Sequence, residues 1–411
     1  MPRQLSDRGA DRPVAGRAEA PETARRRPRL APHALFFPAA ALYASVALPW
    51  SVLAMIHVVP GPASLATPAG HAHEMLLGYA LAVVAGHQLP PMPRARATAL
   101  FGLWAGARLA FVALPGGAAL ALDGAFALAL AWHVAPRLFR AAKKLRNQGL
   151  PAILTALCAG AIAFDAAMFV SGAAAPQAIP GALVLLLAAL MLFMGGRIIA
   201  PAAAGQFYRQ GESLVARVQP RIEGLLLVLM AGAVVFAVLP GSESFLRIAC
   251  GVAGALALVR LLRWRLWGCE GRPDLLCLGA GYAWLALGLL AVAASAPGSA
   301  RTAAMHLVTI GALGTLTSSV MANTLLQKAR RSPAGETIPV LATALVGAAT
   351  ALRVAAAFAG EHAPIALVAA AACWSAAFVA TFRLIRRSLR APAAPARTPR
   401  APLREAGSII P

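Results

Sequence analysis

Residues 180–200 read PGALVLLLAALMLFMGGRIIA, and no residue in this stretch is charged before Arg197. A bilayer core needs about 20 mostly apolar residues per helix, so the stretch predicts a membrane-spanning helix. Eleven further stretches of similar size, each bounded by Pro, Gly or charge, follow the same pattern. The predicted helices are 34–59, 72–90, 98–115, 117–136, 150–172, 180–200, 222–240, 244–262, 275–295, 302–326, 338–359 and 363–383. The sequence therefore predicts an all-α fold, a polytopic membrane helix bundle of about twelve transmembrane helices.

Composition supports a membrane protein and excludes several soluble classes. Of the 411 residues, 59% are hydrophobic and 13% are charged, whereas a globular domain carries about 25% charged residues. The five cysteines are too few and too scattered for a disulfide framework or a zinc site. The sequence also contains no phosphate-binding glycine loop, nucleophile elbow or Cys-x-x-Cys-His haem attachment motif. No soluble type of catalytic site is therefore expected.

The distribution of positive charge predicts the topology. The formal net charge is +22, a basicity that would usually suggest a nucleic-acid partner. If the N-terminus is cytoplasmic, however, 33 of the 37 Lys and Arg residues fall in the two tails and in the cytoplasmic loops, as the positive-inside rule requires. The expected partner of these cations is anionic membrane lipid, and no nucleic acid is expected. Both termini are predicted to be cytoplasmic, with disordered Arg-rich tails at 1–33 and 384–411 on either side of a transmembrane domain at 34–383.

Two histidines lie at the outer entrance of the second predicted helix, in the run His71-Ala72-His73-Glu74-Met75. On a regular helix His71 and Glu74 share a face and His73 points elsewhere, so the two histidines are predicted to have different partners. Neutral imidazole is a common metal ligand and a usual axial ligand of haem iron, and Glu74 could orient a ring through its second nitrogen. A polar cap facing the outer solvent explains the same residues equally well, and both interpretations stay open.

Further ionisable residues lie inside predicted helices, where a charge costs several kcal/mol and marks a functional candidate. His306 lies about one turn inside the outer end of the tenth helix, and Asp165 lies in the fifth. Arg108 and Asp123, on consecutive helices, are predicted to form a buried ion pair. A contact from Arg108 to an anion, such as a haem propionate, is the alternative.

Several segments spread along the chain resemble the NnrS family of bacterial inner-membrane proteins. They are His71-Ala72-His73-Glu74-Met75-Leu76-Leu77-Gly78, Gly195-Gly196-Arg197, Arg260-Leu261-Leu262-Arg263-Trp264, Gly281-Tyr282-Ala283-Trp284-Leu285 and Met305-His306-Leu307-Val308-Thr309-Ile310-Gly311. The resemblance implies a twelve-helix protein of the bacterial inner membrane that contains haem and copper and takes part in the response to nitric oxide and nitrosative stress.

The resemblance also implies roles for individual residues. His71, His73 and His306 become the expected haem or copper ligands, with Glu74 as a supporting residue and Arg108 as a further cofactor contact. Nitric oxide or its iron complexes become possible partners. The chain departs from the family pattern at Gly279, where a histidine is common, and it is a divergent member that leaves open whether haem, copper or both are retained.

Two other functions stay open. A twelve-helix plan with both ends inside is common among secondary transporters of small solutes, although the two halves of this chain have no evident internal similarity. A haem–copper redox enzyme would need several buried histidines near the middle of the membrane, and the sequence has too few. The expected activity is therefore binding and protection, and enzymatic turnover is left undecided.

Overall fold

The computed structural model describes residues 29–114, 116–172 and 176–390, and these residues are almost entirely helical. Two strands of two residues each pair in antiparallel register among them, with Arg29 opposite Pro93. The elements are β1 (Arg29–Leu30), α1 (His33–Met55), α2 (Pro68–His73), η1 (Glu74–Ala80), α3 (Leu81–Gln88), β2 (Met92–Pro93), α4 (Arg94–Ala113), α5 (Gly117–Ala141), α6 (Leu145–Ser171), α7 (Ala178–Arg209), η3 (Val215–Arg217), α8 (Pro220–Val238), α9 (Glu243–Arg263), η4 (Leu266–Gly268), α10 (Pro273–Ala294), α11 (Ser299–His306), η5 (Leu307–Gly314), α12 (Thr315–Lys328), η6 (Pro333–Gly335), α13 (Ile338–Ala356), η7 (Gly360–His362) and α14 (Ala363–Arg390).

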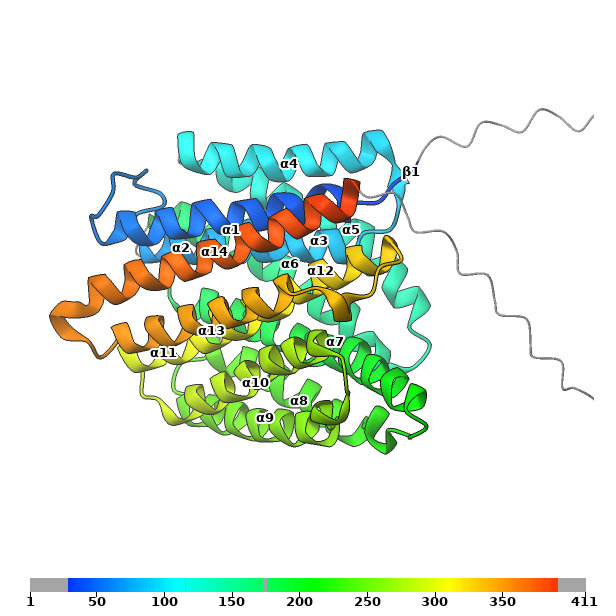
Figure 1. Ribbon diagram of the computed structural model, residues 1–411. Coiled ribbons are helices and arrows are strands. Elements are labelled where there is room, and N and C mark those ends of the chain that lie inside the picture. Colours follow the sequence, from blue (N-terminus) through cyan, green and yellow to red (C-terminus); the bar gives the residue numbers. More distant parts are fainter. Residues whose placement is uncertain (1–28, 115, 173–175, 391–411) are drawn as a thin grey trace, which may run out of the picture.

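Each of the twelve predicted stretches corresponds to one helical segment of the bundle (Figure 1). Ten of these segments are long and apolar enough to cross a membrane. The remaining two are residues 68–88, which are divided among the shorter helices α2, η1 and α3, and α4, whose apolar character is reduced by Arg94, Arg96 and Arg108. The predicted all-α membrane bundle is confirmed, and the chain is a multi-pass membrane protein.

Some helices continue past their predicted ends. α7 was expected to end at residue 200 and continues to Arg209, and α14 continues from the expected 383 to Arg390. Hydropathy marks where a helix leaves lipid, whereas backbone hydrogen bonding continues until a residue breaks it. Most of the predicted tails at 1–33 and 384–411 lies outside the described residues.

The two described ends of the chain lie at the same end of the bundle, as an even number of crossings requires (Figure 1). We call it the basic end, because the loop and helix-end cations such as Arg137, Lys143 and Lys144 belong to the segments that meet there. The α1–α2 and α10–α11 connections lie at the opposite, distal end. The common side of the two ends agrees with the predicted topology, and the orientation of the basic end toward the cytoplasm stays a prediction.

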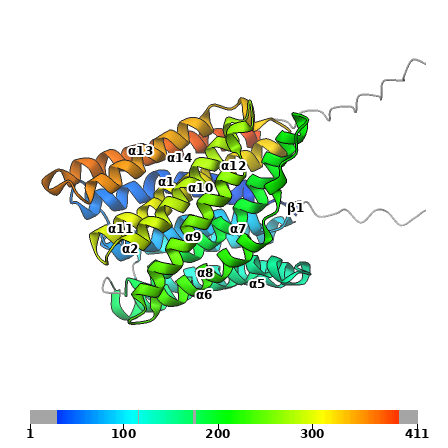
Figure 2. The ribbon, with the colours of Figure 1, turned by 90° about the horizontal axis from the view of Figure 1, so that it is seen from below.

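The centre of the bundle is formed by α7 and the composite helix of α11, η5 and α12. In each of these segments 72% of an apolar 18-residue stretch is buried inside the bundle. The corresponding share for Val215–Val238 is 17%. α13 and α14 lie on one side of this centre, and α5, α6 and α8 lie on the other (Figure 2). Large apolar side chains such as Leu109, Trp132 and Val170 are exposed on the outside, where lipid takes the place of water.

α9 and α10 approach closely at Gly254. A Cβ atom at this position would lie 2.9 Å from the carbonyl oxygen of Ala286 and 2.9 Å from the amide nitrogen of Leu290. Small residues at such crossings let helix backbones approach one another in membranes.

We therefore expect Gly254→Ala to destabilise the bundle. The added methyl group forces α9 and α10 apart, and overpacking of this kind costs about 1–3 kcal/mol. The measurement is the apparent Tm of the purified protein in detergent, which should fall. Gly102→Ala is the control, because no described atom lies within 4 Å of its Cβ position. Equal Tm values for the two variants would contradict the close contact.

Candidate functional site

Two π-helical segments interrupt long helices in the described part of the chain, and each directly follows a predicted ligand histidine. His73 ends α2 and is followed by η1, and His306 ends α11 and is followed by η5. π-helical turns are rare and are found frequently at functional sites. Both histidines lie in the distal half of the bundle.

His73 is fully buried, and both of its ring nitrogens have carboxylate partners. Nδ1 lies 2.8 Å from Oε1 of Glu74, and Nε2 lies 2.9 Å from Oδ1 of Asp165. Nε2 also lies 3.7 Å from Oδ2 of Asp123. The imidazole stacks on Phe111 with 4.3 Å between ring centroids and 6° between planes. Hydrogen bonds and stacking together fix the orientation of the ring.

Glu74 connects His73 to a buried arginine. Nη1 of Arg108 lies 2.9 Å from each carboxylate oxygen of Glu74, and Nη2 forms an ion pair with Asp123. The Tyr43 hydroxyl donates a further hydrogen bond to Glu74. Glu74 is 0% exposed and Arg108 is 4% exposed, so these contacts form in the protein interior. We call the connected set the buried ionic cluster; its members are Tyr43, His73, Glu74, Arg108, Asp123 and Asp165.

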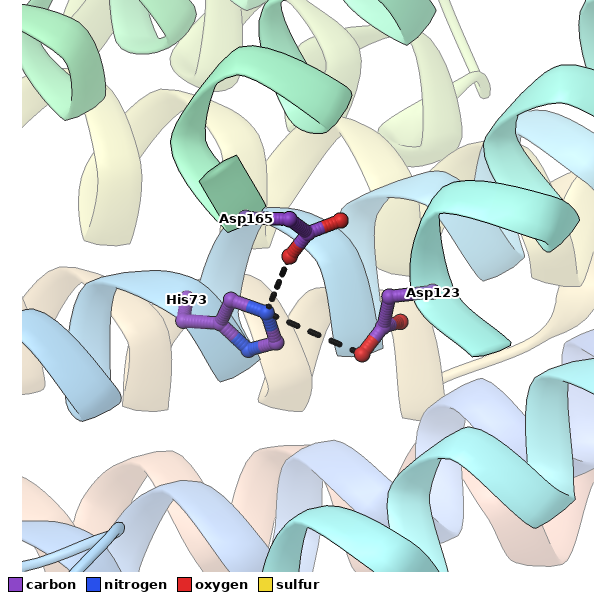
Figure 3. Close-up of side chains that lie close together, drawn as sticks. All are labelled: His73, Asp123 and Asp165. Atoms are coloured by element: carbon purple, nitrogen blue, oxygen red, sulfur yellow. Dashed lines mark hydrogen bonds and ion pairs between the residues drawn. The ribbon is translucent and has the colours of Figure 1, made fainter. Parts of the chain in front are cut away.

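Six segments contribute to the buried ionic cluster, and one of them is η1, which carries Glu74. Tyr43 comes from α1, and Arg108 comes from α4. Asp123 in α5 and Asp165 in α6 point toward His73 at the end of α2 (Figure 3). Gly78 makes room for the assembly, because a Cβ atom there would lie 2.8 Å from Nη1 of Arg108 and 2.8 Å from Oε2 of Glu74.

The structure corrects one prediction about these residues and confirms two. The regular-helix spacing predicted that Glu74 shares a face with His71, but its partner is His73. His73 and Glu74 are adjacent in the sequence, and the i, i+3 and i, i+4 rule for a helix face does not describe a contact between neighbouring residues. The expected ion pair between Arg108 and Asp123 is present, and the two histidines have different partners.

His71 belongs to a second group at the distal end. Its Nδ1 lies 3.3 Å from Oγ of Ser51, and Nδ1 of His306 donates to the carbonyl oxygen of Thr302 at 2.6 Å. Among the described residues, Nε2 of each ring has no hydrogen-bond partner. The two imidazoles, which we call the distal histidine pair, lie close enough to interact electrostatically with each other and with Arg353 of α13.

An apolar groove with a cavity volume of about 100 Å³ lies between α3, α7, α10 and α12. Its lining is apolar except for His87, Gln88 and Thr317. Nδ1 of His87 is buried and has no hydrogen-bond partner in the part of the chain that the structure describes. This volume is smaller than the roughly 300–1,000 Å³ of typical ligand pockets, and the lining suits an apolar molecule better than a polar solute.

Comparison with known families gives one match, to the model described as NnrS protein, over residues 29–392. The chain belongs to the NnrS family. No curated protein matches the chain.

The family assignment agrees with the resemblance noted in the sequence, and the structure explains some of its motifs. Nη2 of Arg260 lies 2.8 Å from Oε1 of Glu223, and a Cβ atom at Gly196 would collide with this guanidinium. A Cβ atom at Gly195 would likewise collide with Tyr282. These NnrS motifs therefore build a tightly packed helix contact around a buried arginine.

The predicted site residues separate into two places. His73, Glu74 and Arg108 come together in the buried ionic cluster, while His71 and His306 form the distal histidine pair. Which of them bind haem or copper stays a prediction.

Other members of the two groups were not predicted as site residues. The sequence marks Asp165 only as an ionisable residue within a predicted helix, and Arg353 is one of the four cations outside the tails and the cytoplasmic loops. No sequence signal pointed to Tyr43, because its role depends on the packing of α1 against η1.

Loss of the Arg108 charge should strongly destabilise the protein. Arg108→Gln leaves Glu74 and Asp123 buried without their counter-charge, and removal of one partner from a buried ion pair costs about 3–5 kcal/mol. We expect a clear drop in the apparent Tm in detergent and partial recovery when Asp123→Asn is added, because one stranded charge is then removed.

Arg301→Gln is the matched control for Arg108→Gln. Its ion-pair partner, Glu243, has a side chain that is 41% exposed, so the loss should be small. If Arg301→Gln and Arg108→Gln lowered the Tm equally, burial of the cluster would not be what makes Arg108 important.

Proposed function

We propose that this member of the NnrS family is a haem- and metal-binding protein of the bacterial inner membrane that contributes to resistance against nitric oxide and nitrosative stress. The nitric oxide role rests on family membership. The observation that carries the proposal is the convergence of His71 and His306, from helices far apart in the sequence, beside Arg353. We propose binding and protection, without assigning turnover.

The donor set of the distal histidine pair fits haem. Because Nδ1 of His306 donates to a carbonyl oxygen, its Nε2 carries the lone pair that a metal requires. Nε2 of His71 likewise has no hydrogen-bond partner in the described part of the chain, whereas both ring nitrogens of His73 contact carboxylates. These contacts favour His71 over His73 as the partner of His306. Haem held here would supply an iron centre for a small diatomic ligand.

Arg353 fits the acidic part of a haem. No ion pair joins Arg353 to a carboxylate in the described residues, and its half-buried side chain lies close enough to interact electrostatically with both imidazoles. A guanidinium in this position can bind a propionate through two parallel hydrogen bonds. Arg108 is engaged by Glu74 and Asp123, which makes it the weaker candidate for this contact.

The proposal also includes copper as a bound metal and anionic lipid as a partner of the basic end. Imidazole suits copper as well as iron, so His71, His73 and His306 are also the candidate copper ligands. The cations at the basic end would contact anionic headgroups of the cytoplasmic leaflet. The apolar lining of the groove beside His87 does not favour transport of a polar solute, which counts against the transporter alternative.

The absorption spectrum of the purified protein tests haem binding. Protein from haem-replete cells should have a Soret band, and the band should be lost or shifted in His71→Ala and His306→Ala because each removes one proposed haem-binding residue. His57→Ala and His362→Ala are matched controls, since these histidines are exposed and also lie at the distal end. A colourless wild-type protein would contradict haem binding.

A His87→Ala variant separates the two possible haem positions. If the Soret band disappears in His87→Ala and persists in the double variant His71→Ala/His306→Ala, haem lies in the apolar groove and the assignment to the distal histidine pair is wrong.

Protection from nitric oxide is tested in cells. A bacterial strain that lacks its own NnrS protein should recover growth sooner after addition of a nitric oxide donor when it expresses the wild-type chain. The His306→Ala variant, expressed to the same level, should give less protection because it lacks a proposed haem ligand, and His362→Ala should protect like the wild type. Equal recovery with and without the wild-type chain would argue against the protective role.

A further inference from the structure

The buried ionic cluster contains a set of ligand atoms that is separate from the distal histidine pair. Nε2 of His73 and one carboxylate oxygen each of Asp123 and Asp165 all lie within 4.8 Å of one another (Figure 3). Donors that bind one ion at about 2.0–2.2 Å are separated from one another by about 3–4.4 Å. The 2.9 Å and 3.7 Å distances from Nε2 to Asp165 and Asp123 are therefore close to those of a first coordination shell.

Two oxygens at this position lack partners. Oδ2 of Asp123 and Oδ2 of Asp165 are buried, and neither accepts a hydrogen bond within the described ranges. The two residues are only 2% and 4% exposed. A buried acceptor without a partner is costly, and a carboxylate oxygen more so. Because the unpartnered Oδ2 of Asp123 faces Nε2 of His73, the missing partner belongs between them.

The charges of the cluster also call for a cation. Glu74, Asp123 and Asp165 are three carboxylates, and Arg108 is the only permanently charged cation bonded to them among the described residues. With His73 neutral, two negative charges remain uncompensated in a low-dielectric interior. One divalent cation would neutralise them, as would two bound protons.

The hydrogen bonds of His73 prepare it as a ligand. If Nδ1 donates its proton to Glu74, Nε2 presents a lone pair toward the two aspartates. A carboxylate that accepts from the second nitrogen of a metal-bound histidine is a recurrent arrangement that fixes the tautomer and the direction of the ring. Arg108 and Tyr43 hold Glu74 in this position.

We propose that His73, Asp123 and Asp165 form a binding site for one divalent transition-metal ion, Fe²⁺ or Mn²⁺, with Glu74 orienting the imidazole. The ligand atoms are two carboxylate oxygens and one imidazole nitrogen, a set that suits these ions, and no thiolate belongs to the set. The site does not depend on haem binding at the distal histidine pair.

Metal binding to the purified protein tests this site. After removal of bound metal with a chelator, the wild-type protein in detergent is titrated with MnCl₂, and free Mn²⁺ is followed by electron paramagnetic resonance. We expect about one site per chain, as one ion would share the three ligands. Metal analysis of protein that has not been treated with chelator should find, in a similar ratio, either Mn or Fe in excess of the iron that the Soret band assigns to haem.

Variants of the cluster assign the site. Glu74→Gln should weaken Mn²⁺ binding about 10–100-fold, the usual effect of losing an outer partner of a metal ligand, and Asp165→Asn should weaken it further. Asp274→Asn is the control, because Asp274 is equally buried but pairs with Arg272 outside the cluster. Unchanged Mn²⁺ affinity in Asp165→Asn would overturn the proposal.

Thermal unfolding distinguishes a metal ion from bound protons. Bound Mn²⁺ should raise the apparent Tm of the wild type and leave that of Asp165→Asn unchanged, because a ligand stabilises only the state that binds it. If no metal binds and Asp165→Asn is more stable than the wild type, the extra charge is carried by protons and the proposal is wrong. The Soret band of each sample, recorded in parallel, reports haem binding separately.

Discussion

The guanidinium of Arg108 lies between the carboxylates of Glu74 and Asp123 in the interior of a bundle whose outer surface is apolar. A charge inside a membrane costs about 2.5–3.5 kcal/mol or more unless it is paired, so Arg108 constrains every helix that contacts it. α4 must turn Arg108 toward the interior, and α5 must place Asp123 at the same depth. η1 must approach the guanidinium so closely that residue 78 has to be glycine. The positions of His73 and Asp165 follow from this arrangement, because both are connected to Arg108 through the carboxylates.

The fold was largely predictable from the sequence, for a simple physical reason. Lipid offers no hydrogen bonds to the backbone, so an apolar run of about 20 residues forms a helix, in which the backbone groups bond to one another. The placement of Lys and Arg then sets the topology. Helix ends were less predictable, as α7 and α14 show, because the helical hydrogen-bond pattern continues beyond the apolar region.

The site was predictable in its residue types and only partly in its contacts. Ionisable residues in apolar helices attracted attention to His73, Glu74, Arg108 and His306, and the neighbouring helices α4 and α5 made the pair of Arg108 with Asp123 foreseeable. The pairing of His73 with Glu74 was not foreseeable from helix periodicity, because that rule relates residues three and four apart and not sequence neighbours. Tyr43, Asp165 and Arg353 could be assigned only from packing between segments remote in the sequence.

The short helix α2 carries one histidine of each group, but the remaining members come from different parts of the chain. All side chains of the buried ionic cluster belong to the first 171 residues, whereas the distal histidine pair and Arg353 require α11 and α13. Membrane helices are made from the N-terminus onward, and N-terminal units generally fold first. The ionic cluster can therefore be complete while the ribosome is still translating the second half of the protein. The distal histidine pair, in contrast, forms only near the end of translation, so its cofactor must be acquired by an almost finished chain.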